Sequence, residues 1–279
     1  MKKIQTSLNV NWLVSLLILL LAGCSAKNNP LAENDDKVIE YETASYIKAS
    51  PEKMQWFNDA KFGLFIHWGV YAVPAGLWSK NNTFESRFDG DDSDLYSPHN
   101  YSERLLHATN MPLSEYEKIP ALFDWSDFNA QDYIDLCFES GQRYIVITSK
   151  HHDGFAMWRS KASEWNIGDA TPYGRESGRD PLKELADACQ ATKTNGSPWE
   201  IKMCFYYSHC ADWHEDDAAA FNYKRRTDPS VEVFQNYLDR KVKPQVTELL
   251  TEYEIERRPT SLKILLIIVP AKIVIAWVM

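Results

Sequence analysis

The chain has 279 residues, 44% of them hydrophobic and 13% aromatic, and its formal net charge is −9 at pH 7. This length and apolar content are enough for one large domain, because a single hydrophobic core serves chains of up to roughly 250–300 residues. The negative charge, with no basic stripe along the sequence, argues against the class of proteins that bind nucleic acid through its phosphate backbone.

Residues 1–23 are predicted to be an export signal. Two lysines follow the initial methionine, and residues 12–21 form an apolar run too short for an ordinary membrane-spanning helix. The next stretch, Leu21-Ala22-Gly23-Cys24, resembles a bacterial lipoprotein signal, although an ordinary secretory signal with an incidental cysteine is the alternative. We expect lipidated Cys24 to anchor the chain to the cell envelope (periplasm or outer membrane), with residues 24–44 as a polar tether.

The chain from about residue 45 to residue 253 alternates between strand-like and helix-like patterns. The predicted strands are 62–66, 144–148 and 201–207. The predicted helices run from Asn129 to Gly141, from Asp180-Pro181 onward, and from about Val231 to Tyr253 with Pro244 bending or splitting the last one. The long connection from residue 70 to about 129 is typical of a functional loop or lid. This order implies parallel βαβ units and an α/β fold class.

A barrel and an open, doubly wound sheet both fit this order of elements. The loop after the first predicted strand contains no glycine-rich phosphate-binding pattern, which weakens the dinucleotide-binding alternative. Polar residues follow every predicted strand: His67 the first, His151 and His152 the second, and Ser208 the third. A (β/α)₈ barrel builds its active site at these carboxyl ends.

The cysteines and histidines do not predict a metal centre. Cys137, Cys189, Cys204 and Cys210 form no CxxC pair and no zinc-type spacing, and the first three are expected to be buried free thiols. The run His151-His152-Asp153 is predicted not to chelate a metal, because adjacent residues of a strand point to opposite faces.

A second polar group follows the third predicted strand. His209, Asp212 and His214 are either ligands or a charged rim, and the rim is the preferred interpretation.

Three motifs in order resemble one known family. Residues 56–69 read WFNDAKFGLFIHWG, residues 144–155 read YIVITSKHHDGF and residues 205–208 read FYYS, with Trp165-Asn166 and Arg179-Asp180-Pro181 between the last two. Over about residues 45–253 the chain is similar to the retaining α-L-fucosidases of glycoside hydrolase family 29. The resemblance implies a (β/α)₈ TIM-type barrel, incomplete with about its first half present. It also implies release of terminal α-L-fucose from glycoconjugates through a covalent fucosyl-enzyme intermediate, without a cofactor.

The resemblance also implies sugar-binding residues. His67 is similar to a family histidine that hydrogen-bonds a fucose hydroxyl, and His151 and His152 match paired histidines that contact further hydroxyls. A neutral imidazole both donates and accepts a hydrogen bond, which suits a hydroxyl. Without the resemblance, His67 alone would be interpreted as a core histidine.

Two further residues match the family's sugar site. Tyr206 matches a tyrosine of the third motif, and Glu103 is similar to a sugar-binding glutamate. Arg104 stands where the family usually has an aromatic residue, and Glu103 alone would be interpreted as a solvated surface acid. The candidate apolar walls against the sugar ring are Trp68, Trp78 and Trp158.

The catalytic carboxylates have no match in this sequence. A retaining glycosidase needs two carboxyl groups about 5–5.5 Å apart, but no Asp or Glu follows Glu256, and residues 254–279 are a divergent apolar tail. We therefore expect a truncated or frameshifted chain, and its nucleophile and acid/base are unknown. Such a chain should have unpaired sheet edges and should hydrolyse no fucoside by itself. The alternatives are a non-catalytic fucose-binding lipoprotein and a non-sugar lipoprotein with a Rossmann-like sheet.

Overall fold

The computed structural model describes residues 51–90, 92–97, 101–220, 223–253, 266–268 and 274–276, all within the unit Ile47–Met279. The predicted signal peptide, the tether and the lipidation site Cys24 lie outside the described residues, as does most of the 254–279 tail. Within these segments, no helix combines the length and the apolar character needed to cross a membrane.

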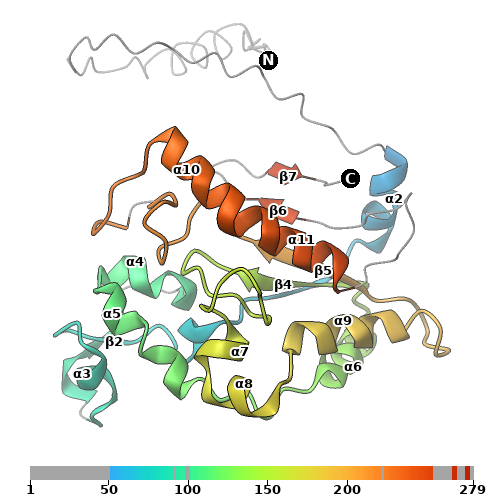
Figure 1. Ribbon diagram of the computed structural model, residues 1–279. Helices are drawn as coiled ribbons and strands as arrows, with labels where there is room; N and C mark the ends of the chain where they lie inside the picture. Colours follow the sequence, from blue (N-terminus) through green and yellow to red (C-terminus); the bar gives the residue numbers. More distant parts are fainter. Residues whose placement is uncertain are drawn as a thin grey trace, which may run out of the picture. The chain divides into compact units, whose positions relative to one another are not determined.

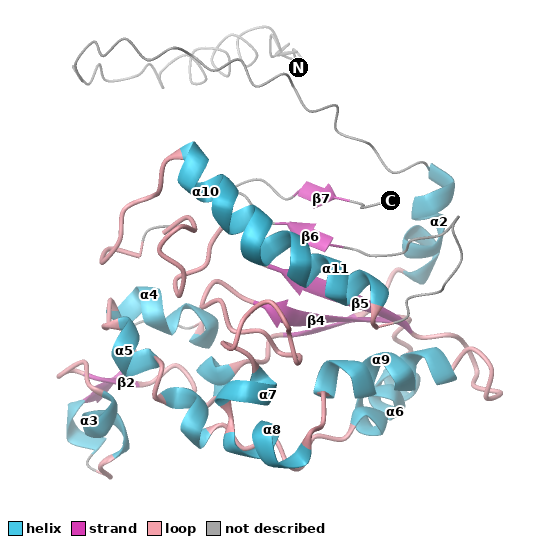
Figure 2. Ribbon diagram, in the orientation of Figure 1, coloured by secondary structure: helices cyan, strands magenta, loops and turns pink. Residues whose placement is uncertain are grey.

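A five-stranded sheet forms the centre of the described structure, in the order β1-β4-β5-β6-β7 (Figures 1 and 2). The first four strands in this order run parallel, and β7 is antiparallel to β6. Over the described residues the sheet is open, with β1 and β7 at its two ends. Its strands are β1 (Leu64–Ile66), β4 (Tyr144–Lys150), β5 (Lys202–Tyr207), β6 (Leu266–Ile268) and β7 (Val274–Ala276). The α/β class with parallel strands is confirmed.

The two faces of the sheet carry different layers. Ile145, Ile147, Met203 and Phe205 pack into the main hydrophobic core together with residues of helices α6 (Ala130–Ser140), α9 (Pro181–Ala191) and α11 (Lys243–Thr251). The alternate residues Val146, Cys204 and Tyr206 belong to a small separate cluster with Trp56, Phe57 and Tyr144. Successive side chains of a strand point to opposite faces, so the helices cover one face and leave the other lightly covered.

Local sequence signals explain where the helices begin and end. The Asn129 side chain accepts a hydrogen bond from the Gln131 amide before α6, and Gly141 ends the helix at a φ of 78°. Asp180 caps α9 by accepting from the Lys183 amide, with Pro181 as the first helical residue. These boundaries agree with the sequence prediction.

The last helical stretch is divided as predicted. Helix α10 (Val231–Tyr237) continues into a π-helical turn, η5 (Leu238–Val242), and then into α11. Pro244 lies at the start of α11, where the missing N–H and the ring of proline disturb the preceding turn.

The connection between β1 and α6 contains short helices and a two-stranded ribbon rather than one long loop. The ribbon pairs β2 (Trp78–Ser79) with β3 (Leu95–Tyr96) in antiparallel fashion. The short helices are α3 (Phe84–Phe88), α4 (Leu105–Thr109), α5 (Leu113–Tyr116), η1 (Val70–Ala72), η2 (Asp92–Asp94), η3 (Ser102–Arg104) and η4 (Ile119–Leu122). Outside this connection, α2 (Pro51–Ala60) precedes β1, and α7 (Ile167–Ala170) and α8 (Pro172–Ser177) lie between β4 and α9.

The four described cysteines are free thiols. Cys137, Cys189 and Cys204 are buried, as predicted, and Cys210 is half-buried. Burial raises the pKa of the Cys137 thiol to about 11, which keeps it protonated at neutral pH.

Candidate functional site

The carboxyl ends of β1, β4 and β5 lie side by side and place the predicted site residues at one edge of the sheet. The strand register pairs Ile66 with Ile147 and Thr148 with Tyr206. His67 directly follows β1, so it lies at the level of Thr148 and Tyr206. Parallel strands bring residues that are distant in the sequence to this edge.

The Thr148 hydroxyl holds the backbone next to His67. Thr148 Oγ1 accepts from the Trp68 amide at 3.0 Å and donates to the Trp68 carbonyl at 3.0 Å. Because its single proton is used in that second bond, the Tyr71 hydroxyl, 3.1 Å away, must donate to Thr148 Oγ1. Three hydrogen bonds on one buried side chain therefore orient the residue that follows β1.

Four of the predicted sugar-binding residues converge, and we call them the strand-end cluster: His67, Glu103, His151 and Tyr206. The Tyr206 ring stacks on the His151 ring, with centroids 5.3 Å apart and planes 18° apart, and the His67 ring lies 5.8 Å from His151. The polar ligand atoms of His67, Glu103 and His151 all lie within 4.8 Å of one another. Glu103 comes from η3, so a third segment joins the two strand ends.

His152, the fifth predicted residue, lies beside this cluster with a partner of its own. Its ring centroid is 4.4 Å from that of His151, and its Nδ1 is 2.7 Å from Ser208 Oγ. Ser208 donates its hydroxyl proton to the Ala211 carbonyl, so His152 must donate through Nδ1–H. This bond assigns the neutral tautomer in which Nε2 of His152 is an acceptor.

The strand-based argument about His151, His152 and Asp153 is wrong in its premise. Strand β4 ends at Lys150, and these three residues lie in the turn that follows. Their side chains therefore do not alternate as they would on a strand.

Burial keeps the imidazoles neutral. Desolvation, followed by the neighbouring His152, His67 and Arg104, lowers the pKa of His151 well below its ordinary value. Desolvation and the Lys150 ammonium lower the pKa of His152 to about 3. At neutral pH both rings are uncharged, and each offers one donor and one acceptor.

Asp153, the carboxylate next to the paired histidines, is hydrogen-bonded to residues outside the strand-end cluster. It is almost fully buried and accepts hydrogen bonds from the Tyr116 hydroxyl at 2.8 Å and the Phe155 amide at 3.2 Å. Burial raises the pKa of Asp153 to about 6, and these two hydrogen bonds oppose that rise.

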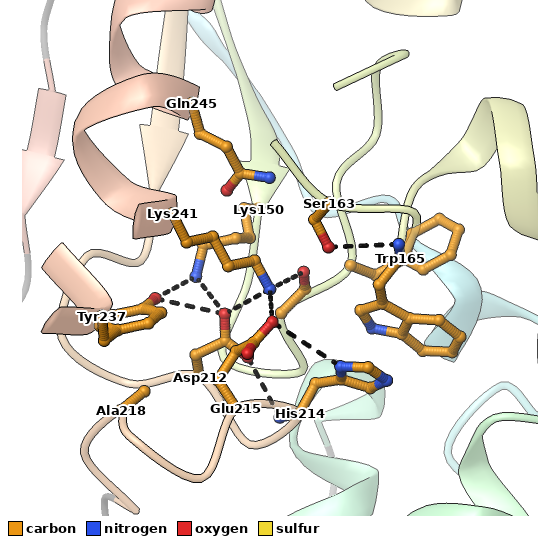
Figure 3. Close-up of polar contacts among 12 residues, drawn as sticks. Lys150, Ser163, Trp165, Asp212, His214, Glu215, Ala218, Tyr237, Lys241 and Gln245 are labelled. Carbon is orange, nitrogen blue, oxygen red and sulfur yellow. Dashed lines mark hydrogen bonds and ion pairs between the residues drawn. The ribbon is translucent and has the colours of Figure 1, made fainter. Parts of the chain in front are cut away.

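Asp212 belongs to a buried charge cluster and not to the predicted rim. Figure 3 shows Asp212 between the ammonium groups of Lys150 and Lys241, at 3.1 and 2.9 Å, and Lys241 also reaches Glu215 at 2.8 Å. The side chains of Asp212 and both lysines are completely buried. Burial alone would raise the pKa of Asp212, but the two lysines outweigh it and hold the pKa at about 2. The rim interpretation is therefore wrong for Asp212. We call Lys150, Asp212, Glu215 and Lys241 the charge cluster.

Gly154 lets the turn after β4 approach the charge cluster. Its φ is +74°, and a Cβ at this position would lie 2.0 Å from Asp212 Oδ1. Only glycine fits both the backbone conformation and the space.

The two other residues of the predicted rim have local partners. The His214 ring stacks on Trp165, with centroids 4.5 Å apart, and its Nε2 lies 3.0 Å from Glu117 Oε1. His209 Nε2 lies 2.8 Å from the Cys210 thiol. Both histidines are half-buried.

The predicted tryptophan walls need correction. Trp78 and Trp158 are fully buried in the core, and Trp158 Nε1 donates to Glu248 at 2.9 Å, so neither can face a ligand. Trp68 stacks on Phe128. The aromatic surface beside the strand-end cluster is instead Phe65, which is 47% exposed and lies 4.6 Å from the His67 ring. Residues 65 and 67 are two apart along β1 and its extension, so their side chains lie on the same face. This spacing was the signal in the sequence by which Phe65 could have been predicted.

Two histidines, a phenol and a carboxylate thus converge beside an exposed aromatic ring at the carboxyl ends of parallel strands, where α/β folds commonly place their ligand sites. A family model described as alpha-L-fucosidase matches residues 29–257. The chain therefore belongs to the α-L-fucosidase family, glycoside hydrolase family 29.

Relatives and solved structures agree with this assignment. The chain is 33% identical over 213 residues to the plasma alpha-L-fucosidase of Rattus norvegicus, which covers 72% of this chain and 38% of the rat protein. It is 35% identical over 134 residues to the tissue alpha-L-fucosidase of Homo sapiens, covering 48% of this chain and 26% of the human protein. The chain thus spans less than two fifths of the length of these curated relatives.

The similar solved structures are also α-L-fucosidases. The enzyme from Vibrio sp. strain EJY3 matches with a TM-score of 0.58 and 32% identity, over 73% of this chain and 31% of that one. AlfC from Lactobacillus casei, in complex with its alpha-L-fucose product, matches with a TM-score of 0.56 and 29% identity, over 72% of this chain and 59% of that one.

Proposed function

We propose that this chain forms the fucose-recognition part of a retaining α-L-fucosidase, an enzyme that hydrolyses terminal α-L-fucose from glycoconjugates. The open sheet is proposed to be about the first half of a (β/α)₈ TIM-type barrel, because β1, β4, β5 and β6 are parallel and helices cover one face. The single observation that carries the proposal is the convergence of His67, Glu103 and His151 at the carboxyl ends of these strands.

The strand-end cluster suits a neutral sugar. The neutral His151 ring donates and accepts, the exposed His67 ring offers its nitrogens, and Glu103 accepts through its carboxylate. The Tyr206 phenol stays protonated because burial raises its pKa to about 12. Phe65 offers an apolar surface next to them. A variant of AlfC forms a complex with Fuca(1,6)GlcNAc. We propose a fucosylated oligosaccharide or glycoconjugate as the partner of this chain as well.

The described carboxylates favour recognition without hydrolysis. A retaining mechanism needs two carboxyl groups about 5–5.5 Å apart, and Glu103 is the carboxylate that lies with the two histidines. Asp153 and Asp212 are fully buried, and their carboxylates are bonded to Tyr116 and to two lysines, respectively. This observation supports, as the second candidate function, a fucose-binding lipoprotein without catalysis.

Export and anchoring form a separate part of the proposal. The apolar run of residues 12–21 and the sequence Leu21-Ala22-Gly23-Cys24 support lipidation of Cys24 and attachment to the cell envelope. Mass spectrometry of the mature protein tests this point, since an unmodified N-terminus at another residue contradicts it.

Calorimetric titration of the full 279-residue chain with L-fucose tests the sugar site, with D-fucose as the mirror-image control. We expect L-fucose to bind and D-fucose not to bind. A parallel assay with an aryl α-L-fucoside separates the two candidates. Binding without release above the uncatalysed rate supports the recognition role alone. Sustained release shows that a carboxylate of this chain is catalytic, and absence of L-fucose binding refutes the site assignment.

A further inference from the structure

The strand-end cluster has the composition of a metal site as well as that of a sugar site. Two imidazoles and one carboxylate come from three separate elements, the end of β1, η3 and the turn after β4, and their ligand atoms lie within 4.8 Å of one another. Imidazole nitrogen and carboxylate oxygen are ligands of zinc and related divalent ions. This grouping differs from the run of adjacent residues 151–153, because the three ligands approach from different directions.

The His151 ring also has a nitrogen without a hydrogen-bond partner among the described residues. His151 is only 7% exposed, and within the described part of the chain its Nδ1 has no hydrogen-bond partner. An unpartnered polar atom in a buried position is destabilising, so a ligand that satisfies it is favoured.

The spacing allows coordination after small side-chain movements. Tetrahedral zinc with bonds of about 2.0–2.1 Å places its ligand atoms about 3.3 Å apart. The widest separation in the cluster therefore has to close by about 1.5 Å. His67 is exposed and Glu103 is half-buried, so both side chains have room to rotate toward the buried His151.

We propose that His67, Glu103 and His151 bind a divalent transition-metal ion of the zinc class, with a fourth position open to water. Glu103 supplies the negative charge that a cation needs, and it partly compensates for the neighbouring Arg104, whose positive charge acts on the same histidine. The metal and the sugar use the same side chains, so they compete. Metal binding itself does not depend on the proposed fucosidase function.

Titration of the full 279-residue chain with Co²⁺, followed by visible absorption, tests the proposal because the probe reports its own coordination. We expect Co²⁺ to fill one saturable site, with a visible absorption spectrum typical of an ion of low coordination number. Glu103→Gln and His67→Gln should each weaken Co²⁺ binding by at least about tenfold, a loss that even outer partners of metal ligands produce. Glu117→Gln is the matched control, because Glu117 also lies beside a histidine, His214, at 3.0 Å. Cys210→Ser controls for a thiolate ligand. Both controls should leave the affinity unchanged.

Two results overturn the proposal: the absence of a saturable Co²⁺ spectrum, or equal affinities in wild type and Glu103→Gln. Addition of L-fucose then separates the metal site from the proposed function. Displacement of Co²⁺ by L-fucose and not by D-fucose supports both. If Co²⁺ binding depends on Glu103 and L-fucose does not bind, the metal site stands and the fucose-recognition proposal fails.

Discussion

The charge cluster and the strand-end cluster contain two consecutive residues of the chain, Lys150 and His151. The polar groups of the two clusters nevertheless have hydrogen-bond and ion-pair partners to different extents. Lys150 belongs to the charge cluster, in which each buried ammonium group has a carboxylate within 3.1 Å. His151, the next residue, belongs to the strand-end cluster and keeps a buried nitrogen without a partner among the described residues. The first arrangement is complete without a ligand, whereas the second leaves bonding capacity for one.

The two clusters differ because Lys150 is the last residue of β4, after a register shift at Thr148/Lys150, whereas His151 already lies in the turn that follows. Lys150 lies on the helix-covered face, where it contacts Tyr237 of α10 and Asp212. His151 stacks on Tyr206, on the lightly covered face. The fully paired charges of the charge cluster should therefore contribute mainly to stability. The strand-end cluster, which has a nitrogen unpartnered within the described segments, should contribute mainly to ligand binding. Four predictions test this division.

Asp212→Asn should have the largest effect. The substitution leaves Lys150 and Lys241 as buried ammonium groups without their shared carboxylate, which typically costs about 3–5 kcal/mol. Chemical denaturation of the full chain measures the change in the free energy of unfolding. Asp187→Asn is the control, because the Lys183–Asp187 pair is exposed and should contribute about 0.5 kcal/mol or less. Equal losses in both variants would contradict a special role for the charge cluster.

Acid should remove the contribution of Asp212 in a defined pH range. The folded-state pKa is lowered from 3.8 to about 2, which corresponds to roughly 2–3 kcal/mol of stability. Because the pKa is depressed, this stability is fully present above pH of about 4 and is lost as the pH falls toward about 2. The difference in unfolding free energy between wild type and Asp212→Asn should narrow over that range. A difference that stays constant with pH would show that Asp212 does not titrate as proposed.

Thr148→Val should have an intermediate effect on both stability and binding. Valine keeps the shape but removes the hydroxyl that hydrogen-bonds the Trp68 backbone and Tyr71, so we expect a loss of about 1–2 kcal/mol in unfolding free energy. The affinity for L-fucose should also fall, since His67 is next to Trp68. Thr247→Val, at an exposed helix position, is the control and should change the stability by about 0.5 kcal/mol or less. Unchanged fucose affinity in Thr148→Val would argue against this positioning role.

His67→Ala should have the smallest effect on stability and a clear effect on binding. The side chain is exposed, so the unfolding free energy should change by about 0.5 kcal/mol or less. Loss of its hydrogen bond should weaken L-fucose binding by roughly tenfold, measured by calorimetry. A large stability loss with unchanged affinity would reverse the distinction between the two clusters.

The sequence by itself determined the local structure and the order of the site residues. Asn129, Gly141 and Asp180-Pro181 act through hydrogen bonds and backbone angles within a few residues, so the ends of α6 and the start of α9 were readable. Pro244 marked the division of the last helical stretch in the same way. The motifs around His67 and His151 followed two predicted strands, and parallel pairing of those strands is enough to bring them to one edge.

Only the tertiary structure decided which polar and aromatic side chains are buried and with what partners. Asp212 was expected at a rim but lies between Lys150 and Lys241, one of which is 62 residues away in the chain. Trp158 was expected to face a ligand but donates to Glu248 inside the core. An acid or a tryptophan looks the same in a sequence whether it faces water or the interior. Its environment is set by long-range contacts between elements, and local patterns carry no information about those contacts.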